Sequence, residues 1–150
     1  MAAYVAVIGP SEATAREMET AEEVGRALAL SGAKIVCGGL GGVMAAVCRG
    51  ATGGRGMTIG LLPGDDRSSA NEWVQVAIPT GLGELRNGLI VRSADAVIAV
   101  GGAYGTLSEI ALALKSGIPV FGLDTWEIDG VQPVESPERA VRLALERAKR

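Results

Sequence analysis

The sequence predicts an α/β fold, a single Rossmann-like domain with a doubly wound, mostly parallel sheet of six or seven strands. Short apolar runs rich in Val, Ile and Leu alternate with amphipathic segments along the whole chain, which is typical of a parallel sheet covered by helices. Clusters of glycine follow several of these runs. With 48% apolar residues, residues 1–150 are expected to form one domain with its own core.

The strands and helices are expected to alternate in chain order. Apolar residues three and four apart predict a helix over residues 14–30, and Gly32 is a natural residue just past its end. Ser136 and Pro137 are typical of a helix start, with Ser as the cap and Pro at the first position. Strands are expected at residues 3–8, 34–37, 57–62, 73–78, 96–100 and 118–123, with a short edge strand near 131–134, and further helices at residues 43–49, at 83–94 and after a turn at 101–105.

One stretch combines these features most clearly. Residues 96–100 form an apolar run, and residues 101–105 form a glycine-rich turn. A strand, a glycine turn and a helix in this order favour an anion site, because the turn lets a ligand approach the main chain and the helix N-terminus offers free N–H groups. The helix that follows is expected to bury one face, made by Leu107, Ile110, Ala111 and Leu114.

Composition excludes several kinds of site and partner. The chain has no His and only two Cys, Cys37 and Cys48, which excludes a Cys/His zinc site, a disulfide scaffold and a Ser-His-Asp or Cys-His catalytic arrangement. No metal site is expected, and Cys37 is interpreted as a small buried residue. A net charge of −3 disfavours nucleic acid and anionic membranes as partners. No signal peptide or spanning run is visible, so a cytoplasmic location is expected.

Three turns that contain glycine are expected to follow strand ends, at residues 9–11, 38–42 and 101–105. Because the carboxyl ends of parallel strands share one edge, the turns are expected to meet there and hold a phosphate-bearing small molecule. None has the G-x-G-x-x-G spacing of a dinucleotide site, and a Walker A sequence is absent, so a mononucleotide-like group is favoured over NAD. The candidate binding residues are Gly9, Ser11, Gly38, Gly39, Gly41, Gly42, Gly101, Gly102, Ala103, Tyr104, Gly105 and Thr106, flanked by Asn71 and Asn87.

Three side chains near these turns each have two interpretations. Glu109 fits a capping box with Thr106, and it also fits an acid–base group or ribose ligand at the mouth of the turn. Arg86 is either a surface residue of its helix or the cation that balances the phosphate, since its fork of donors suits phosphate oxygens. Tyr104 either covers a ligand or packs against the next loop.

The stretch from Arg86 to Glu109 resembles the signature of the Lonely Guy proteins, cytokinin-activating nucleoside 5'-monophosphate phosphoribohydrolases. In that pattern an Arg precedes an Asp by nine residues, and a strand and P-G-G-x-G-T-x-x-E follow. Here Arg86 precedes Asp95, and residues 101–109 read G-G-A-Y-G-T-L-S-E. Residues 38–44 resemble the family's second motif, G-G-G-x-x-G-L-M. The resemblance covers nearly the whole chain, and it implies Arg86 and Glu109 as the catalytic residues of an N-glycosidase.

Departures from that pattern resemble a sister group, the molybdenum cofactor carrier proteins. Gly101 stands in place of the family's Pro, Ala103 in place of its second Gly, and Asn87 in place of the Lys after the Arg. Leu82 to Leu85 lacks the Met-His of the pattern. Proteins of this sister group bind a pterin phosphate cofactor. The resemblance therefore adds Thr80, which precedes Gly81, to the candidate binding residues, and it implies a homo-oligomer, either a dimer or a tetramer.

The wider family has also been labelled lysine decarboxylase, and that activity is not expected here. Such chemistry usually needs a lysine that forms a Schiff base with pyridoxal phosphate. The chain has three lysines, Lys34, Lys115 and Lys149, and none falls in the expected site.

Three functional hypotheses follow. The first is a protein that binds a phosphate-bearing, nucleotide-like small molecule, with the molybdenum cofactor or a nucleoside monophosphate as ligand and no cofactor required. The second is an N-glycosidase acting on nucleoside 5'-monophosphates, in which Glu109 stabilises an oxocarbenium-like state or activates water and Arg86 holds the phosphate. The third is a regulatory ligand sensor that acts through an oligomer.

Overall fold

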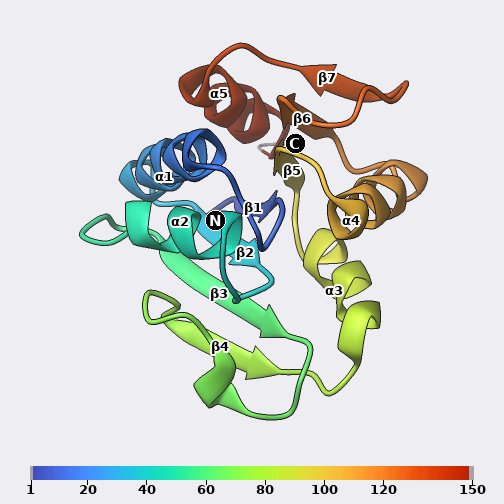
Figure 1. Ribbon diagram of the computed structural model, residues 1–150. Coiled ribbons are helices and arrows are strands. Elements are labelled where there is room, and N and C mark those ends of the chain that lie inside the picture. The colour runs from blue at the N-terminus through green and yellow to red at the C-terminus, as the bar shows by residue number, and fades with distance from the viewer. Residues whose placement is uncertain (1, 149–150) are drawn as a thin grey trace.

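Seven parallel strands form one sheet in the computed structural model, which describes residues 2–148 (Figure 1). The strands are β1 (Tyr4–Ile8), β2 (Lys34–Cys37), β3 (Met57–Leu62), β4 (Val76–Pro79), β5 (Ala96–Val100), β6 (Val120–Leu123) and β7 (Val131–Pro133). Their order in the sheet is β4-β3-β2-β1-β5-β6-β7, and every neighbouring pair is parallel. The predicted α/β, Rossmann-like fold with a doubly wound sheet is therefore confirmed.

Helices cover both faces of this sheet. The helices are α1 (Ala15–Leu30), α2 (Val43–Gly50), α3 (Arg86–Arg92), α4 (Tyr104–Lys115) and α5 (Pro137–Ala148), with short 3₁₀ turns η1 (Arg67–Ser69) and η2 (Gly83–Leu85). Figure 1 shows α1, α2 and α5 on one side and α3 and α4 on the other, and the core is accordingly split into two apolar clusters separated by the sheet. No helix in residues 2–148 is both long and apolar enough to cross a membrane.

The strand order places a switch point between β1 and β5. The chain runs outward from β1 through β2 and β3 to β4, then returns to the centre and continues outward through β5 to β7. At the switch point the connections after β1 and β5 leave toward opposite faces, which opens a crevice at the carboxyl edge of the sheet. Val5 to Ile8 pairs in register with Ala96 to Ala99, so the ends of these two strands lie side by side.

Local signals explain where several helices begin. Thr14 and Glu17 form a capping box at α1: the Glu17 N–H donates to Thr14 Oγ1 at 3.1 Å, and the Thr14 N–H donates to Glu17 Oε1 at 2.9 Å. The predicted cap of the last helix is confirmed, because the Arg139 N–H donates to Ser136 Oγ at 3.2 Å. These bonds satisfy first-turn N–H groups that have no partner inside the helix.

The structure differs from the predicted elements in two places on the β4–α3 side. The expected strand at 73–78 is shorter and later, at Val76–Pro79. The residues before it are held by side chains instead of a ladder, since the Trp73 N–H donates to Asn71 Oδ1 and the Gln75 N–H to Thr58 Oγ1. The expected helix at 83–94 is divided into η2 and α3 between Leu85 and Arg86, and its first residue, Gly83, has a positive φ of 60°.

The helix after β5 also begins earlier and faces a different way than predicted. It starts at Tyr104, inside the predicted glycine turn. Its buried residues are Thr106, Glu109, Ile110 and Ala113, whereas Ala111 is exposed and Leu107 and Leu114 are only partly buried. The periodicity of the apolar residues was misleading because two polar side chains, Thr106 and Glu109, occupy the inward face.

We predict that Gly25→Ala destabilises the fold. A Cβ at Gly25 would overlap the carbonyl group of Val47, because α1 and α2 pack backbone to backbone at this point. Overpacking of this kind costs about 1–3 kcal/mol, so the midpoint of urea unfolding should fall clearly.

Gly105→Ala is the matched control, since nothing lies within 4 Å of a Cβ at that position. Its stability should equal that of the wild type or exceed it slightly, as Ala favours a helix. Equal midpoints for Gly25→Ala and the wild type would contradict the close packing of α1 on α2.

Candidate functional site

A cavity of about 280 Å³ opens at the carboxyl ends of β1 and β2, next to the N-terminus of α4. All three predicted turns contribute to its wall, so their expected convergence on one edge is confirmed. Helix α3 and the first turns of α4 close the other side. Of the predicted site residues, Gly9, Ser11, Gly38, Arg86, Asn87, Ala103, Gly105, Thr106 and Glu109 line the cavity.

The first two turns meet in direct backbone contact. The Val43 N–H at the start of α2 donates to the Pro10 carbonyl oxygen at 3.0 Å. Gly42 has a positive φ of 61°, and a Cβ there would collide with the carbonyl oxygens of Pro10 and Ser11. A Cβ at Gly9 would lie 2.5 Å from the carbonyl oxygen of Val100. Glycine is therefore required at these positions for packing between the turns.

Two of the predicted binding residues, Asn71 and Thr80, bond to the backbone next to the cavity and are not part of its wall. The Asn71 side chain donates to the Leu40 carbonyl oxygen at 2.9 Å, and the Thr80 hydroxyl donates to that of Leu62 at 2.7 Å. These bonds fix the second turn and the end of β3. The predicted residues that are not part of the cavity wall are Gly39, Gly41, Gly42, Asn71, Thr80, Gly101, Gly102 and Tyr104.

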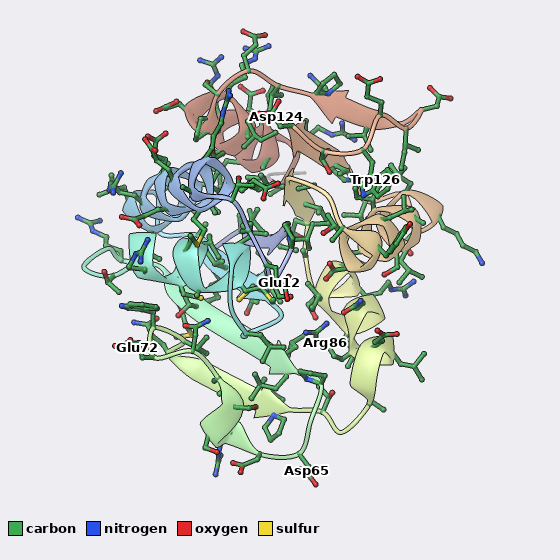
Figure 2. The ribbon with its side chains drawn as sticks, in the orientation of Figure 1. Glu12, Asp65, Glu72, Arg86, Asp124 and Trp126 are labelled. Atoms are coloured by element: carbon green, nitrogen blue, oxygen red, sulfur yellow. The ribbon has the colours of Figure 1, made fainter. Side chains whose placement is uncertain are left out.

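Tyr104 lies outside the cavity and is 84% exposed. Its ring stacks on Trp126, with 6.3 Å between the centroids, and Trp126 in turn donates from Nε1 to the Ala103 carbonyl oxygen at 3.1 Å. Figure 2 shows Trp126 beside α4. Of the two interpretations of Tyr104, the structure shows packing against the next loop.

Arg86 is buried, so its interpretation as a surface residue is wrong. Its Nε donates to the Leu61 carbonyl oxygen at 2.8 Å, one terminal nitrogen donates to Asn87 Oδ1, and the other lies 3.5 Å from the Gly38 carbonyl oxygen. Figure 2 shows the side chain extending from α3 toward the end of β3. Burial lowers the pKa of Arg86, and the nearby Glu109 opposes that shift.

Glu109 is buried in the wall of the same cavity. It cannot form the predicted capping box, because α4 starts at Tyr104 and the cap residue is Ala103, which has no side-chain cap. Burial raises the pKa of Glu109 to about 8, although the Arg86 guanidinium acts to lower it. At neutral pH this carboxyl group is therefore largely protonated.

The start of α4 offers unpaired donors to the cavity. The first helical N–H with a partner is that of Leu107, which donates to the Ala103 carbonyl oxygen at 2.9 Å, so the preceding N–H groups are free for a ligand. The Thr106 hydroxyl is buried and has no partner among the described residues. Buried hydroxyl groups normally have one, so this hydroxyl has capacity for a ligand.

The charges of the cavity follow from these positions. Among residues 2–148, Arg86 and Glu109 are the only buried charged side chains, and both line the cavity. With Glu109 largely neutral at pH 7 and Arg86 cationic, the buried part of the cavity carries a net positive charge, while the exposed Glu84 carboxylate lies at the rim. The positive end of the α4 dipole adds to it. Such a cavity favours an anion.

The described residues offer few groups for Schiff-base or metal-dependent chemistry in this cavity. Lys34 lies at the first residue of β2, at the opposite edge of the sheet, and Lys115 lies at the last residue of α4. Lys149 falls outside the described residues. Within the described part of the chain, no group of three or more His, Cys, Asp or Glu side chains is placed to hold a metal ion. No lysine lines the cavity.

Sequence reasoning missed part of the cavity wall. Leu40 and Met44 supply apolar surface from the second turn and α2, and Pro63 and Glu84 supply the rim opposite α4. Leu40 and Met44 belong to the recognised motif at 38–44, which was the available signal. Nothing in the local sequence marks Pro63, because it reaches the cavity only through the pairing of β3 with its neighbours.

The fold and this cavity define a class: a Rossmann-like α/β protein with a polar crevice at the switch point of its sheet. Within that class, the chain belongs to the SLOG cluster4 family, whose model matches residues 2–149.

Individual proteins are similar over nearly the whole length. A molybdenum cofactor binding protein from the phototrophic bacterium Rippkaea orientalis superposes with a TM-score of 0.92 at 36% identity, covering 97% of each chain. The molybdenum cofactor carrier protein of Chlamydomonas reinhardtii gives a TM-score of 0.87 at 28% identity over 100% of both chains. An uncharacterized protein of Archaeoglobus fulgidus is 40% identical over 142 residues, 94% of this chain and 93% of that protein. The resemblance to molybdenum cofactor carriers is thus confirmed.

We predict that Glu109 makes the stability of the protein fall as pH rises. The pKa of Glu109 is about 8 in the folded protein against an ordinary value of 4.5. Between these two pH values the unfolded chain has released a proton that the folded protein retains. The free energy of unfolding should then decrease with rising pH, by at most about 1.4 kcal/mol per pH unit.

Urea unfolding of the wild type and Glu109→Gln between pH 5 and pH 9 measures this effect. Gln imitates the protonated acid, so the variant should gain stability over the wild type as pH rises through this range. Glu84→Gln is the control, because Glu84 is exposed at the rim and its loss should not alter the wild-type slope. Parallel curves for the wild type and Glu109→Gln would contradict the assigned protonation.

Proposed function

We propose that the protein binds a phosphate-bearing, nucleotide-like small molecule in this cavity, with the molybdenum cofactor as the favoured ligand. The observation that carries the proposal is the buried Thr106 hydroxyl without a partner, at the open N-terminus of α4 and in the wall shared with Arg86. A phosphate would accept hydrogen bonds from this hydroxyl and from the free N–H groups of the first turn.

The donor set fits a pterin phosphate. Backbone N–H groups, one hydroxyl and one guanidinium suit a phosphate group, and Leu40 and Met44 supply apolar surface for a flat ring. A volume of about 280 Å³ holds the phosphate and part of a ring, so the rest of the ligand would extend past the rim at Glu84. The similarity to molybdenum cofactor binding and carrier proteins supports the same ligand class.

Arg86 would supply both charge and hydrogen bonds in this proposal. Three of its five N–H donors point to Leu61, Asn87 and Gly38, which leaves two for a phosphate group. The proposal includes the cytoplasmic location and the homo-oligomeric state that the sequence led us to expect. It includes no decarboxylase activity, because no lysine of the described part of the chain lines the cavity.

We predict that Thr106→Val weakens ligand binding without weakening the fold. The hydroxyl has no partner among residues 2–148, so its removal should leave the free energy of unfolding unchanged or raise it by about 1 kcal/mol. Loss of a hydrogen bond to a charged phosphate should lower the affinity for molybdopterin, or for GMP as a simpler probe, by roughly 10- to 100-fold. Calorimetric titration and urea unfolding measure the two effects.

Thr58→Val is the matched control with the opposite pattern. Thr58 is buried far from the cavity wall, donates to the Trp73 carbonyl oxygen at 3.2 Å and accepts from the Gln75 N–H at 2.9 Å. This variant should lose stability and keep its affinity. If the wild type binds neither molybdopterin nor any nucleoside monophosphate more tightly than millimolar, and no such ligand is found by mass spectrometry of the purified protein, the proposed function is wrong.

A second function is favoured by one specific observation, the buried Glu109 in the wall that it shares with Arg86, where burial raises its pKa to about 8. An acid with a pKa near the working pH suits general acid–base catalysis. As an N-glycosidase, the protein would break the bond between ribose and base of a nucleoside 5'-monophosphate, with Glu109 as the acid–base group or the stabiliser of the oxocarbenium-like state.

Incubation with AMP and with an adenine-type cytokinin monophosphate, followed by chromatography, tests this function. We predict that any release of base falls at least about 100-fold in Glu109→Gln, as expected for loss of a general acid–base group, while nucleotide binding persists. Release of base at the wild-type rate in Glu109→Gln would exclude the assigned role.

A further inference from the structure

The two cysteines of the chain lie against each other in the core, next to the second turn of the cavity. Cys37 is the last residue of β2 and Cys48 lies in α2. Both are free thiols and both are buried, so the predicted burial of Cys37 is confirmed. Their sulfur atoms are 3.7 Å apart, in hydrogen-bond contact. A chain with two cysteines thus brings both of its sulfurs together.

The packing of β2 and α2 keeps the two sulfurs at this distance. Strand β2 is paired with β1 on one side and with β3 on the other, where Cys37 itself pairs with Gly60. Helix α2 lies beside α1 (Figure 1), and a Cβ at Gly25 of α1 or at Gly50 of α2 would collide with the backbone of the other helix. Both sulfurs are therefore carried by elements that have little freedom to separate.

The surroundings make the two thiols chemically unequal. The hydrogen bond with Cys48 lowers the pKa of Cys37, and the Gly39 N–H and the Arg86 guanidinium act in the same direction, against the effect of burial. The same hydrogen bond raises the pKa of Cys48, and burial adds to that shift. Cys37 is therefore the thiol that ionises first, and the ionised thiol is the nucleophile.

We propose that Cys37 and Cys48 form a redox-active pair, which hydrogen peroxide converts into an intramolecular disulfide that restrains the second turn of the cavity. The two sulfurs, now 3.7 Å apart, would approach to about 2.05 Å through rotation of their side chains. The proposal rests on this pair and does not depend on which ligand the cavity binds.

The cavity supplies the route for the oxidant, because neither thiol is exposed. Gly38, which follows Cys37, and Met44, one helix turn before Cys48, both line the cavity wall. A Cβ at Gly38 would touch the sulfur of Met44, so the two residues meet where the wall covers the pair. Hydrogen peroxide is little larger than water, and a cavity of about 280 Å³ admits it.

The chemistry is balanced with hydrogen peroxide as the oxidant. The Cys37 thiolate attacks one peroxide oxygen, so that an S–O bond forms, the O–O bond breaks, and hydroxide leaves and takes up the proton that Cys37 had released. The sulfur of Cys48 then attacks the Cys37 sulfur. The S–S bond forms, the S–O bond breaks, and hydroxide leaves with the proton of Cys48 as a second water. Two thiols are oxidised and one peroxide is reduced to water.

The disulfide would close a ring around the second turn. Gly39 and Gly42 have positive φ values of 77° and 61°, in the region that glycine enters freely. Leu40 and Met44, which lie in the same segment, line the cavity. A covalent link between the ends of this segment reduces the conformations open to it, so the redox state of the pair sets how rigid this part of the wall is.

Peroxide treatment of the folded protein, followed by intact-mass spectrometry and a peptide map, tests the proposal. The wild type should lose two hydrogens and contain a disulfide between Cys37 and Cys48 of one chain, which dithiothreitol reverses. Cys48→Ser removes the thiol that traps the first product, so Cys37 should accumulate as sulfenic and then sulfinic acid. In Cys37→Ser, oxidation of Cys48 should be slower by about 10-fold or more.

Three results of this experiment would overturn the proposal. The first is a wild type whose thiols react only after urea is added. The second is a disulfide that links two chains in place of one within the chain. The third is equal rates of oxidation in Cys37→Ser and Cys48→Ser, since the two thiols would then be equivalent.

A second measurement uses the wild type alone and covers the case in which either variant fails to fold. Hydrogen exchange is compared between the reduced and the peroxide-treated protein. Amides of residues 38–48 should exchange more slowly after oxidation, by roughly 10-fold, and those of α5 should serve as an unchanged control. Equal exchange of residues 38–48 in the two states would show that the disulfide does not restrain the turn.

Discussion

The arrangement of the cavity depends on the hydrogen bonds made by the buried guanidinium of Arg86. A buried cation is costly unless its donors are satisfied. Here the acceptors come from the end of β3, from the neighbouring Asn87 and, at longer range, from the Gly38 carbonyl. These contacts connect α3 to the end of β3 and to the turn that follows β2. A Cβ at Gly38 would lie 2.7 Å from an Arg86 terminal nitrogen, so the second turn must carry glycine for the cation to enter.

The protonation state of Glu109 determines how much of the Arg86 charge is offset. An ionised carboxylate beside Arg86 would cancel its charge, whereas burial raises the pKa of Glu109 to about 8, so that near neutral pH the exposed Glu84 at the rim is the other acidic side chain that offsets this charge. The open N-terminus of α4 has the same polarity. Charge, free N–H groups and an unpartnered hydroxyl thus converge on one small volume. The molybdenum cofactor binding and carrier proteins to which the chain is similar have the same fold.

One half of the sheet carries exposed apolar side chains on the side of α3 and α4. Helices α1, α2 and α5 spread over one side, but on the other side α3 and α4 leave β3 and β4 with exposed Val76 and Ile78. The segment that carries Arg86 lies between this surface and the cavity.

The order of strands and helices and the three glycine turns were determined by the sequence, because buried strands and glycine corners leave local patterns that need no knowledge of neighbours. Only the tertiary structure decided which polar residues face inward. Glu109 fitted a helix cap by spacing, yet α4 begins at Tyr104 and turns Thr106 and Glu109 toward the cavity. Likewise Arg86 was compatible with an exposed position until the pairing of β3 placed the Leu61 carbonyl against it. Burial and charge depend on contacts between distant segments, and no local pattern encodes them.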